Sequence, residues 1–344
     1  MKKKYIPFLF FFMIVSSLFA QDPQFTQFYA APLYLNPGFA GATLQSRAVF
    51  NGRAQWAGIS KPFVTYAASF DYNFDKFKSG LGVLAVFDKA GTGSLTSSAF
   101  SAIYSYKVNL PYKWTFRPGL QFTYGSRSLD YYKLTFGDQL DLNASVPLST
   151  SETFDRTQRI NYFDFSAGGI LHNDKFWFGI SAHHLNRPDE SLNNGKSIVP
   201  TKFNILGGVK IDLVNSVYKS RKTREQSITP TFMYKFQGKY DQLDLGFYYN
   251  YTPLVIGLWY RGIPAIKKYA PGYGNNDAIA ILLGFRQEDF TIGYSYDLTI
   301  SKLSPTNTTG SHEISISYVF EKGGLGNRKR KIRRKDMVIP CPKF

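Results

Sequence analysis

Cysteine is nearly absent from this sequence of 344 residues: Cys341 is the only one, so no disulfide framework can form. We expect Cys341 to be a free structural thiol rather than a redox-sensitive thiol or a partner contact. Beyond the N-terminal region, no apolar run approaches the roughly 20 residues that a membrane-spanning helix needs. No glycine-rich phosphate loop precedes a helix, because the glycines fall in predicted strands and turns. These absences exclude a disulfide-stabilised fold, a helical membrane protein and a nucleotide site.

The first twenty residues have the pattern of a secretory signal peptide. A basic start, residues 1–4, is followed by a mostly apolar run, residues 8–18, and by Phe19-Ala20. A membrane-spanning helix is the alternative, but the run is shorter than the roughly 20 residues required. We therefore expect residues 1–20 to be removed after Ala20. No cysteine follows that point, which argues against a lipoprotein anchor.

Aromatic side chains and glycine are abundant, with 24 Tyr, 31 Phe and 29 Gly. An exported chain of this composition is either a soluble all-β protein or an outer-membrane β-barrel. Many segments alternate with a period of two, as half-buried strands do. In residues 290–298 the alternating sets are Phe290, Ile292, Tyr294, Tyr296, Leu298 and Thr291, Gly293, Ser295, Asp297. Aromatics crowd the apolar face near strand ends, as membrane-interface girdles require, and this favours the barrel.

The alternation predicts fourteen antiparallel strands. Most have the length that a tilted strand needs to cross a bilayer. Their predicted ranges are 45–56, 62–73, 79–90, 95–108, 113–125, 161–171, 175–184, 201–213, 227–237, 239–251, 253–261, 277–287, 289–299 and 311–320. We therefore predict an all-β transmembrane barrel over residues 45–320, whose even strand number returns both of its ends to one side.

The connections between these strands are unequal, as in outer-membrane barrels. If the first strand leaves the periplasm, the outward connections include the long loops 126–160, 185–200, 262–276 and 300–310. The inward connections are mostly tight turns. The inward connection 214–226 is an exception, because it is long and basic. This assignment predicts that both termini are periplasmic and that the protein lies in the outer membrane.

A basic tail, residues 321–344, follows the last strand. It carries a large share of the formal net charge of +17 in the run Arg328, Lys329, Arg330, Lys331, Arg333 and Arg334. On an exported protein such a block predicts a docking surface for an acidic partner or for anionic lipid headgroups, and no nucleic-acid site. A solvated tail without a specific partner is the alternative.

The sequence offers two weak candidates for a metal or catalytic site. His183 and His184 lie near Asp189 and Glu190, but adjacent strand residues point to opposite faces and do not easily share a metal. Ser181 and His183 share one face, yet this spacing is common and no third catalytic group accompanies it. We expect no enzyme activity, no metal and no cofactor.

The stretch after the predicted cleavage site, QDPQFTQFYAAPLYLNPGFAG, has neither a helical nor a strand rhythm. It resembles the start of the PorP/SprF family of type IX secretion system outer-membrane proteins. The positions that carry the resemblance are Gln21, Asp22, Pro23, Gln27, Phe28, Pro32, Leu33, Leu35, Asn36, Pro37, Gly38 and Gly41. The chain departs mildly from the pattern at Ala31, where the family often has Asn, and at Gly38, where Ala is common.

The resemblance implies a role in exporting or anchoring a large surface protein, such as a gliding adhesin, through that protein's C-terminal secretion domain. It also implies partners among other secretion or motility components on the periplasmic side. A diffusion or uptake porin is the alternative function. In the first case we expect the outward loops to bind the surface protein, with Tyr131, Tyr132, Leu134 and Phe136 as anchors, because aromatic residues dominate interface hot spots. The alternative for these side chains is a lid over the lumen.

The motif segment, residues 21–44, is too apolar to remain in solvent. Pro23 and Pro37 bias the residues before them toward extended or turn conformations. We predict that the segment packs inside the periplasmic mouth and narrows the lumen. A structural lead-in that seals the first turn is the alternative, and the two are compatible.

Overall fold

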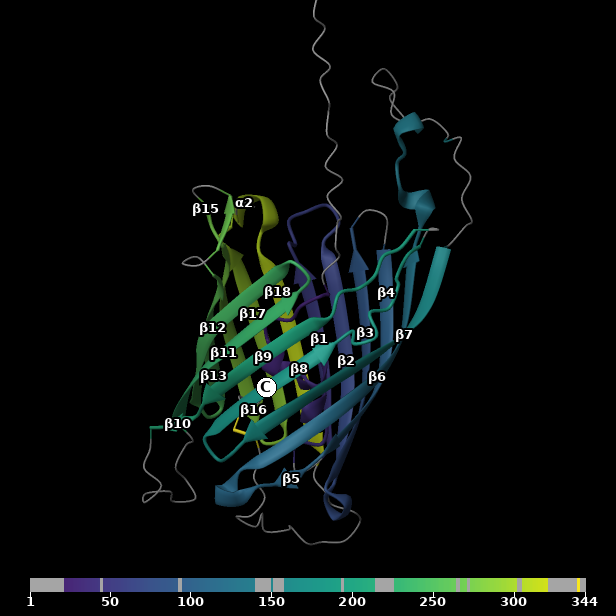
Figure 1. Cartoon of the computed structure of the whole chain (residues 1–344). Helices are drawn as coiled ribbons and strands as arrows, with labels where there is room; N and C mark the ends of the chain where they lie inside the picture. The colour runs from purple at the N-terminus through teal and green to yellow at the C-terminus, as the bar shows by residue number, and fades with distance from the viewer. Residues whose placement is uncertain are drawn as a thin grey trace, which may run out of the picture.

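In the computed structural model, the residues described are 22–43, 46–91, 95–139, 150, 158–192, 195–213, 226–263, 267–270, 273–301, 305–320 and 339–340. Fourteen long antiparallel strands form one closed barrel (Figure 1). Neighbouring strands in the sequence pair in order around the ring. The ring closes where the first strand pairs with the last, with Ser46 opposite Phe320. β9 pairs with β11, the next long strand in the sequence.

The long strands are β1 (Ser46–Gln55), β2 (Phe63–Phe74), β3 (Ser79–Ala90), β4 (Leu95–Tyr106), β6 (Thr115–Leu129), β7 (Gln158–His172), β8 (Phe176–His183), β9 (Lys202–Val209), β11 (Gln226–Gln237), β12 (Tyr240–Tyr251), β13 (Leu254–Gly262), β16 (Asn276–Gln287), β17 (Phe290–Thr299) and β18 (Ser311–Phe320). Short strands are β5 (Val108–Asn109), β10 (Ile211–Asp212), β14 (Lys268–Ala270) and β15 (Tyr273–Gly274). Single helical turns are η1 (Phe28–Ala30), α1 (Pro32–Leu35), η2 (Pro37–Phe39), η3 (Asp75–Phe77), η4 (Pro111–Lys113), η5 (Tyr131–Lys133), η6 (Gly137–Gln139) and α2 (Pro305–Thr308).

The predicted fold class and the fourteen strands are confirmed. The largest differences concern the hairpin of β6 and β7, whose strands are 15 residues each and shorten the predicted loop 126–160 at both ends. β8 and β9 are only 8 residues long. The predicted signal peptide, residues 1–20, lies outside the described residues, as do the connection 214–225 and most of the tail.

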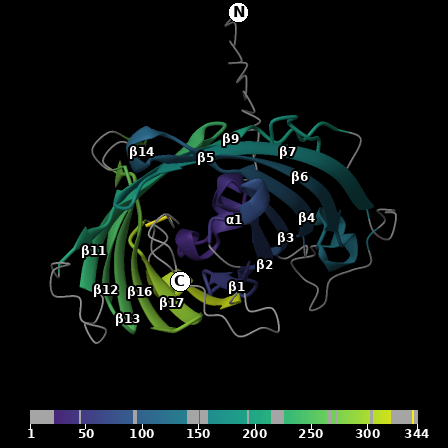
Figure 2. The ribbon, with the colours of Figure 1, turned by 90° about the horizontal axis from the view of Figure 1, so that it is seen from below.

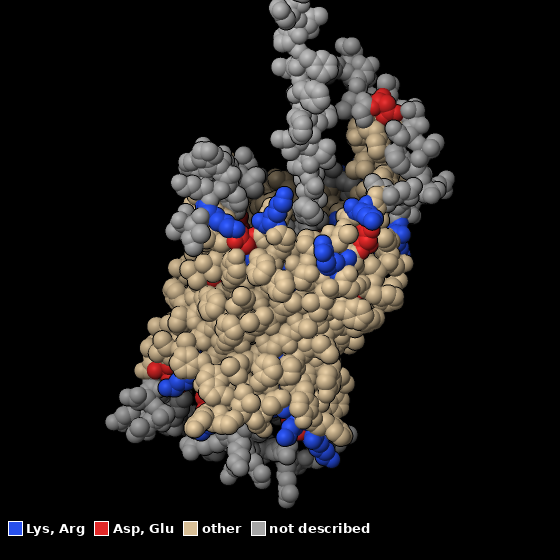
Figure 3. Space-filling view, viewed as in Figure 1, with Lys and Arg blue, Asp and Glu red and all other residues tan. Residues whose placement is uncertain are grey.

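Apolar and polar side chains alternate along the strands, so that apolar side chains cover the outside of the barrel and polar side chains point into the lumen. On β17 the side chains of Phe290 and Tyr294 are exposed, whereas Ser295 and Asp297 are buried inside. Figure 3 shows the result on one face: Lys, Arg, Asp and Glu gather toward the two ends and leave a broad band between them. This is the apolar band that a transmembrane barrel presents to the bilayer.

The two ends of the barrel differ in their connections. At one end, here called the short-turn end, β2–β3, β7–β8, β12–β13 and β16–β17 are joined by two to four residues. At the other end, the long-loop end, the connections include residues 130–157 and 184–201. The predicted asymmetry is therefore present, with 238–239 as a tight turn among the long loops.

The hydrophobic core of the molecule lies inside the barrel. The segment before β1 is folded into the lumen, where Figure 2 shows α1 within the ring of strands. Its side chains Phe28, Leu33 and Phe39 are buried and pack with inward residues of the wall. We call residues 22–43 the plug. In the C-terminal tail, Ile339 is also buried in this cluster.

Candidate functional site

The plug runs the length of the lumen. At the short-turn end, the backbone N–H of Gly41 donates to the Asp71 carboxylate at 3.0 Å. At the long-loop end, Asp22 contacts His184 and Lys202. The segment was predicted at one mouth of the barrel, and it extends further than that. The first and last strands begin and end on one side, with Ser46 opposite Phe320, and the plug brings Asp22 to the other end of the barrel.

Two glycines make this path possible. Gly41 has φ +59°, which favours glycine, and a Cβ there would lie 2.7 Å from the Gly80 Cα. A Cβ on Gly80 of β3 would lie 2.1 Å from the carbonyl oxygen of Ala40. The same oxygen accepts hydrogen bonds from Ser105 at 2.6 Å and from Arg117 at 2.8 Å. The backbone of the plug therefore lies directly on the wall of the barrel.

Prolines and one asparagine shape the middle of the plug. Pro32 begins α1 and Pro37 begins η2, the first helical position where a missing N–H costs nothing. The Asn36 side chain accepts from Gly38 N–H at 2.8 Å and donates to the Ile180 carbonyl at 2.9 Å. These motif residues thus both cap a turn and attach it to β8.

Aromatic rings fill the half of the lumen lined by β8, β12 and β13. Phe28 packs edge-on against Trp259, with ring centroids 4.7 Å apart. The Trp177 indole N–H donates to the Tyr29 hydroxyl at 3.1 Å, and Tyr248 packs against Tyr29 and Trp259. Because all five rings are buried, this cluster fills that part of the lumen with apolar material.

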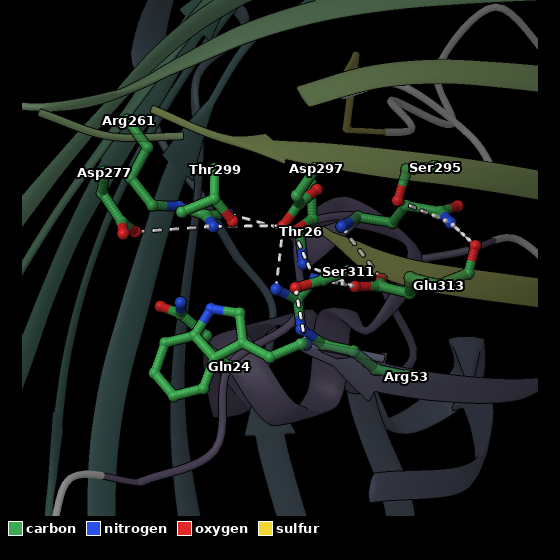
Figure 4. Close-up of polar contacts among 12 residues, drawn as sticks. Gln24, Thr26, Arg53, Arg261, Asp277, Ser295, Asp297, Thr299, Ser311 and Glu313 are labelled. Carbon is green, nitrogen blue, oxygen red and sulfur yellow. Dashed lines mark hydrogen bonds and ion pairs between the residues drawn. The ribbon is translucent and has the colours of Figure 1, made fainter. Parts of the chain in front are cut away.

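A buried charged cluster surrounds Thr26 of the plug (Figure 4). The Thr26 hydroxyl donates to Asp297 at 2.6 Å and accepts from Arg53 at 2.5 Å and from Arg261 at 3.0 Å. Arg53 forms ion pairs with Asp297 at 2.8 Å and with Glu313 at 3.1 Å. Four strands therefore hold one residue of the plug through charged groups that are almost completely buried.

Glu313 also forms hydrogen bonds with the backbone of the plug. Its carboxylate accepts from Thr26 N–H at 2.6 Å and from Gln27 N–H at 2.9 Å. The Gln27 side chain donates to the Glu313 carbonyl at 3.1 Å and accepts from Ser315 at 2.7 Å. Hydrogen bonds to a charged acceptor are stronger than neutral ones, so this is the firmest polar attachment of the plug to β18.

The upper end of the plug is held by ion pairs. Asp22 lies 2.9 Å from His184 Nε2 and 3.1 Å from Lys202 Nζ, and Asp164 lies 3.1 Å from His184 Nδ1. Burial raises the pKa of Asp22, but the charges of Lys202 and His184 outweigh it and hold that pKa well below its usual range. Burial lowers the pKa of His184, yet Asp22 and Asp164 raise it to about 10. Both groups are therefore charged at neutral pH.

The histidines and serine considered from the sequence serve the plug. One of His183 and His184 was expected to face away from the lumen, but both line the cavity inside the barrel. β8 ends at His183, and His184 follows it with a positive φ of 57°, so the alternation of the strand does not continue to His184. Ser181 and His183 do share a face. The Ser181 hydroxyl donates to the Leu35 carbonyl at 2.9 Å, and His183 Nδ1 lies 3.2 Å from the Ser166 hydroxyl. Glu190 pairs with Arg127 instead of with the histidines.

A cavity of about 720 Å³ opens above the plug at the long-loop end, and we call it the vestibule. Asp22, Pro23 and Tyr34 of the plug line it, together with inward residues of β1–β4 and β6–β9 and with the loop 196–200. It was not predicted, because its walls come from segments that are far apart in the sequence.

The residues predicted to bind partners are only partly described. Tyr132 is 68% exposed on η5, whereas Tyr131, Leu134 and Phe136 are half-buried. Asp130 accepts from Tyr132 N–H at 3.2 Å and so orders this turn. Gln21 and the basic run Arg328, Lys329, Arg330, Lys331, Arg333 and Arg334 lie outside the described residues, as does Cys341.

Residues 17–318 of the chain match the PorP/SprF family of type IX secretion system membrane proteins. The chain belongs to the PorP/SprF family. This match includes the whole plug and nearly all of the barrel. The outer-membrane barrel and the type IX secretion family are thereby established.

Solved barrels of low identity are similar to this chain. The outer membrane protein Omp33 of Acinetobacter baumannii is 10% identical, with a TM-score of 0.42 over 81% of this chain and 100% of that one. A variant of the Rh. blastica porin is 9% identical, with a TM-score of 0.34 over 81% and 99%. BamA of Haemophilus ducreyi without POTRA domains 1–3 is 11% identical, with a TM-score of 0.38 over 80% and 70%. No curated protein matches the chain.

Two features are absent from the described residues. None of the described helices is long and apolar enough to cross a membrane. No group of three His, Cys, Asp or Glu side chains among the described residues could hold a metal ion.

Proposed function

We propose that this PorP/SprF protein binds one large exported surface protein at the long-loop end and anchors it or helps to export it. The secretion domain at the C-terminus of that surface protein is the element bound. The observation that carries this proposal is the plug. A lumen filled by an aromatic cluster and a buried charged cluster suits a binding platform better than a diffusion channel.

The orientation is part of the proposal. The short-turn end faces the periplasm and the long-loop end faces outward, because outer-membrane barrels have short periplasmic turns and long external loops. The last strand then delivers the basic tail to the periplasm, where other secretion or motility components are its partners. The plug presents Asp22 to the outer side.

Co-purification from native membranes tests the proposed partner. The tagged protein is extracted in detergent and the bound proteins are identified. We expect one large surface protein carrying a C-terminal secretion domain. Recovery of the barrel alone, combined with strong single-channel conductance, would instead support the porin function.

The η5 turn tests where the surface protein binds. We expect the double variant Tyr132→Ala, Phe136→Ala to lower the amount of surface protein recovered and displayed, since aromatic anchors carry about 2 kcal/mol or more each at interfaces. The matched control is Tyr112→Ala at the short-turn end, where Tyr112 is 93% exposed. If display and recovery are unchanged in the double variant, the turn is not the anchor.

A further inference from the structure

Asp88 of β3 lines the vestibule, and no side chain of the described cavity wall forms an ion pair with it. Its carboxylate accepts a hydrogen bond from the Thr65 hydroxyl at 2.6 Å. Among the described residues it has no ion-pair partner, although it is partly buried in the wall of the cavity. A carboxylate withdrawn from bulk water is stabilised by a cation, so this position favours a positively charged ligand group.

Three Lys and Arg side chains line the vestibule, and none of them forms an ion pair with Asp88. Arg127 pairs with Glu190, and Lys202 pairs with Asp22. Lys196 is exposed on the loop 196–200 and lies beyond ion-pair distance of Asp88. The described wall of the cavity therefore supplies no ion-pair partner for the Asp88 carboxylate.

Aromatic rings in the same cavity can receive a cation and the apolar stem that carries it. Lys202 Nζ already lies 5.2 Å from the centroid of the Tyr34 ring, so a cation–π contact is present in the vestibule. Trp56 and Phe63 line the cavity near the long-loop end, with ring centroids 5.5 Å apart. Small side chains of β4, Ser97 and Ala99, also line the cavity.

The shape of the vestibule decides which kind of ligand fits. The plug forms its floor, so a ligand enters and leaves at the long-loop end. A cavity of about 720 Å³ is within the size range of ligand pockets and holds much more than one side chain. One free carboxylate with one hydroxyl is too small a set of oxygens for a hard metal ion such as Ca²⁺.

We propose that the vestibule binds an extended polypeptide segment carrying an arginine or lysine side chain, whose charged group pairs with Asp88 while its stem packs on the neighbouring rings. The partner is a segment of the exported surface protein, so this inference rests on the proposed function. It locates part of the recognition inside the barrel mouth rather than on the outer loops.

A direct binding measurement tests this site with the intact protein. The probe is an N-acetylated six-residue amide peptide, Gly-Ser-Arg-Phe-Ser-Gly, and its partner probe has citrulline, which is neutral and of the same shape, in place of arginine. Calorimetry or fluorescence anisotropy on the detergent-solubilised barrel gives both affinities. We expect the arginine peptide to bind at least about tenfold more tightly than the citrulline peptide.

Three variants locate the binding. Asp88→Asn keeps the size of the side chain and the contact with Thr65, and we expect it to remove the preference for arginine. Thr65→Val alters the orientation of Asp88 and should weaken binding to a lesser degree. Asp174→Asn is the matched control, since Asp174 is exposed at the short-turn end, and it should leave both affinities unchanged.

The outcomes separate this inference from the proposed function. Equal affinities for the two peptides, no binding of either, or an unchanged preference in Asp88→Asn overturns the basic-segment site. If the wild-type barrel captures a surface protein from native membranes and Asp88→Asn captures as much, this site fails while the proposed function stands. If the wild type captures none, the proposed function itself fails.

Discussion

Glu313→Gln removes the charge that holds the plug and hardly changes the shape of the side chain. In the wild type the Glu313 carboxylate accepts from two plug N–H groups and from Arg53, at 2.6, 2.9 and 3.1 Å. A glutamine would present an N–H₂ group to one of those donors. Breaking a buried ion pair on one side costs about 3–5 kcal/mol. Because Arg53 keeps Asp297, we take the lower figure, about 3 kcal/mol.

Amide hydrogen exchange measures this loss where it occurs. An opening free energy lowered by about 3 kcal/mol raises exchange at Thr26 and Gln27 about a hundredfold. Amides in β3 and β4 should keep their protection, because the ring of strands does not depend on Glu313. The control is Glu288→Gln, at an exposed glutamate in the β16–β17 turn. A change below about threefold at Thr26 would refute the role assigned to the charged cluster.

Two further predictions concern the two ends of the plug. Gly80→Ala puts a methyl group 2.1 Å from the Ala40 carbonyl oxygen and should displace the lower plug and raise ion conductance, whereas Gly52→Ala, with its nearest contact at 3.4 Å, should not. At the upper end, the raised pKa of His184, about 10 against 6.5, gives a stabilisation that is complete below pH 6.5 and lost as pH rises toward 10. The depressed pKa of Asp22 adds one that is present above about pH 3.8 and lost in acid. Amide exchange corrected for its intrinsic pH dependence should therefore show weaker protection of Gln24 and Phe25 at pH 9 than at pH 6, and Asp22→Asn should abolish this difference.

The strands of the barrel were predictable because their signal is local. Alternation in residues 290–298 needs no knowledge of the rest of the chain, and β17 has the predicted faces, with Tyr294 outward and Ser295 inward. Because successive connections alternate between the two ends of the barrel, their lengths predicted that one end has short turns and the other has long loops. The predicted strand ends were less accurate, as in β6 and β7, which are longer than the alternation indicated.

The site was less predictable because its contacts are long-range. Thr26 and Glu313 are 287 residues apart in the sequence, and Asp22 and Lys202 are 180 apart. Periodicity carries no information about such pairs. One signal was available: Arg53 and Glu313 are charged residues within predicted transmembrane strands, where a charge is expensive unless it is paired. That signal identifies them as paired lumen residues but not their common partner, Thr26.

The central claim is that the plug keeps the barrel closed so that it works by binding rather than by diffusion. Single-channel conductance in planar bilayers tests it most directly, comparing the intact protein with a variant that lacks residues 22–43 and whose strand content is verified by circular dichroism. The account predicts little or no conductance for the intact protein and stable open channels for the variant. Porin-like conductance of the intact protein, or a folded variant that stays closed, would contradict it.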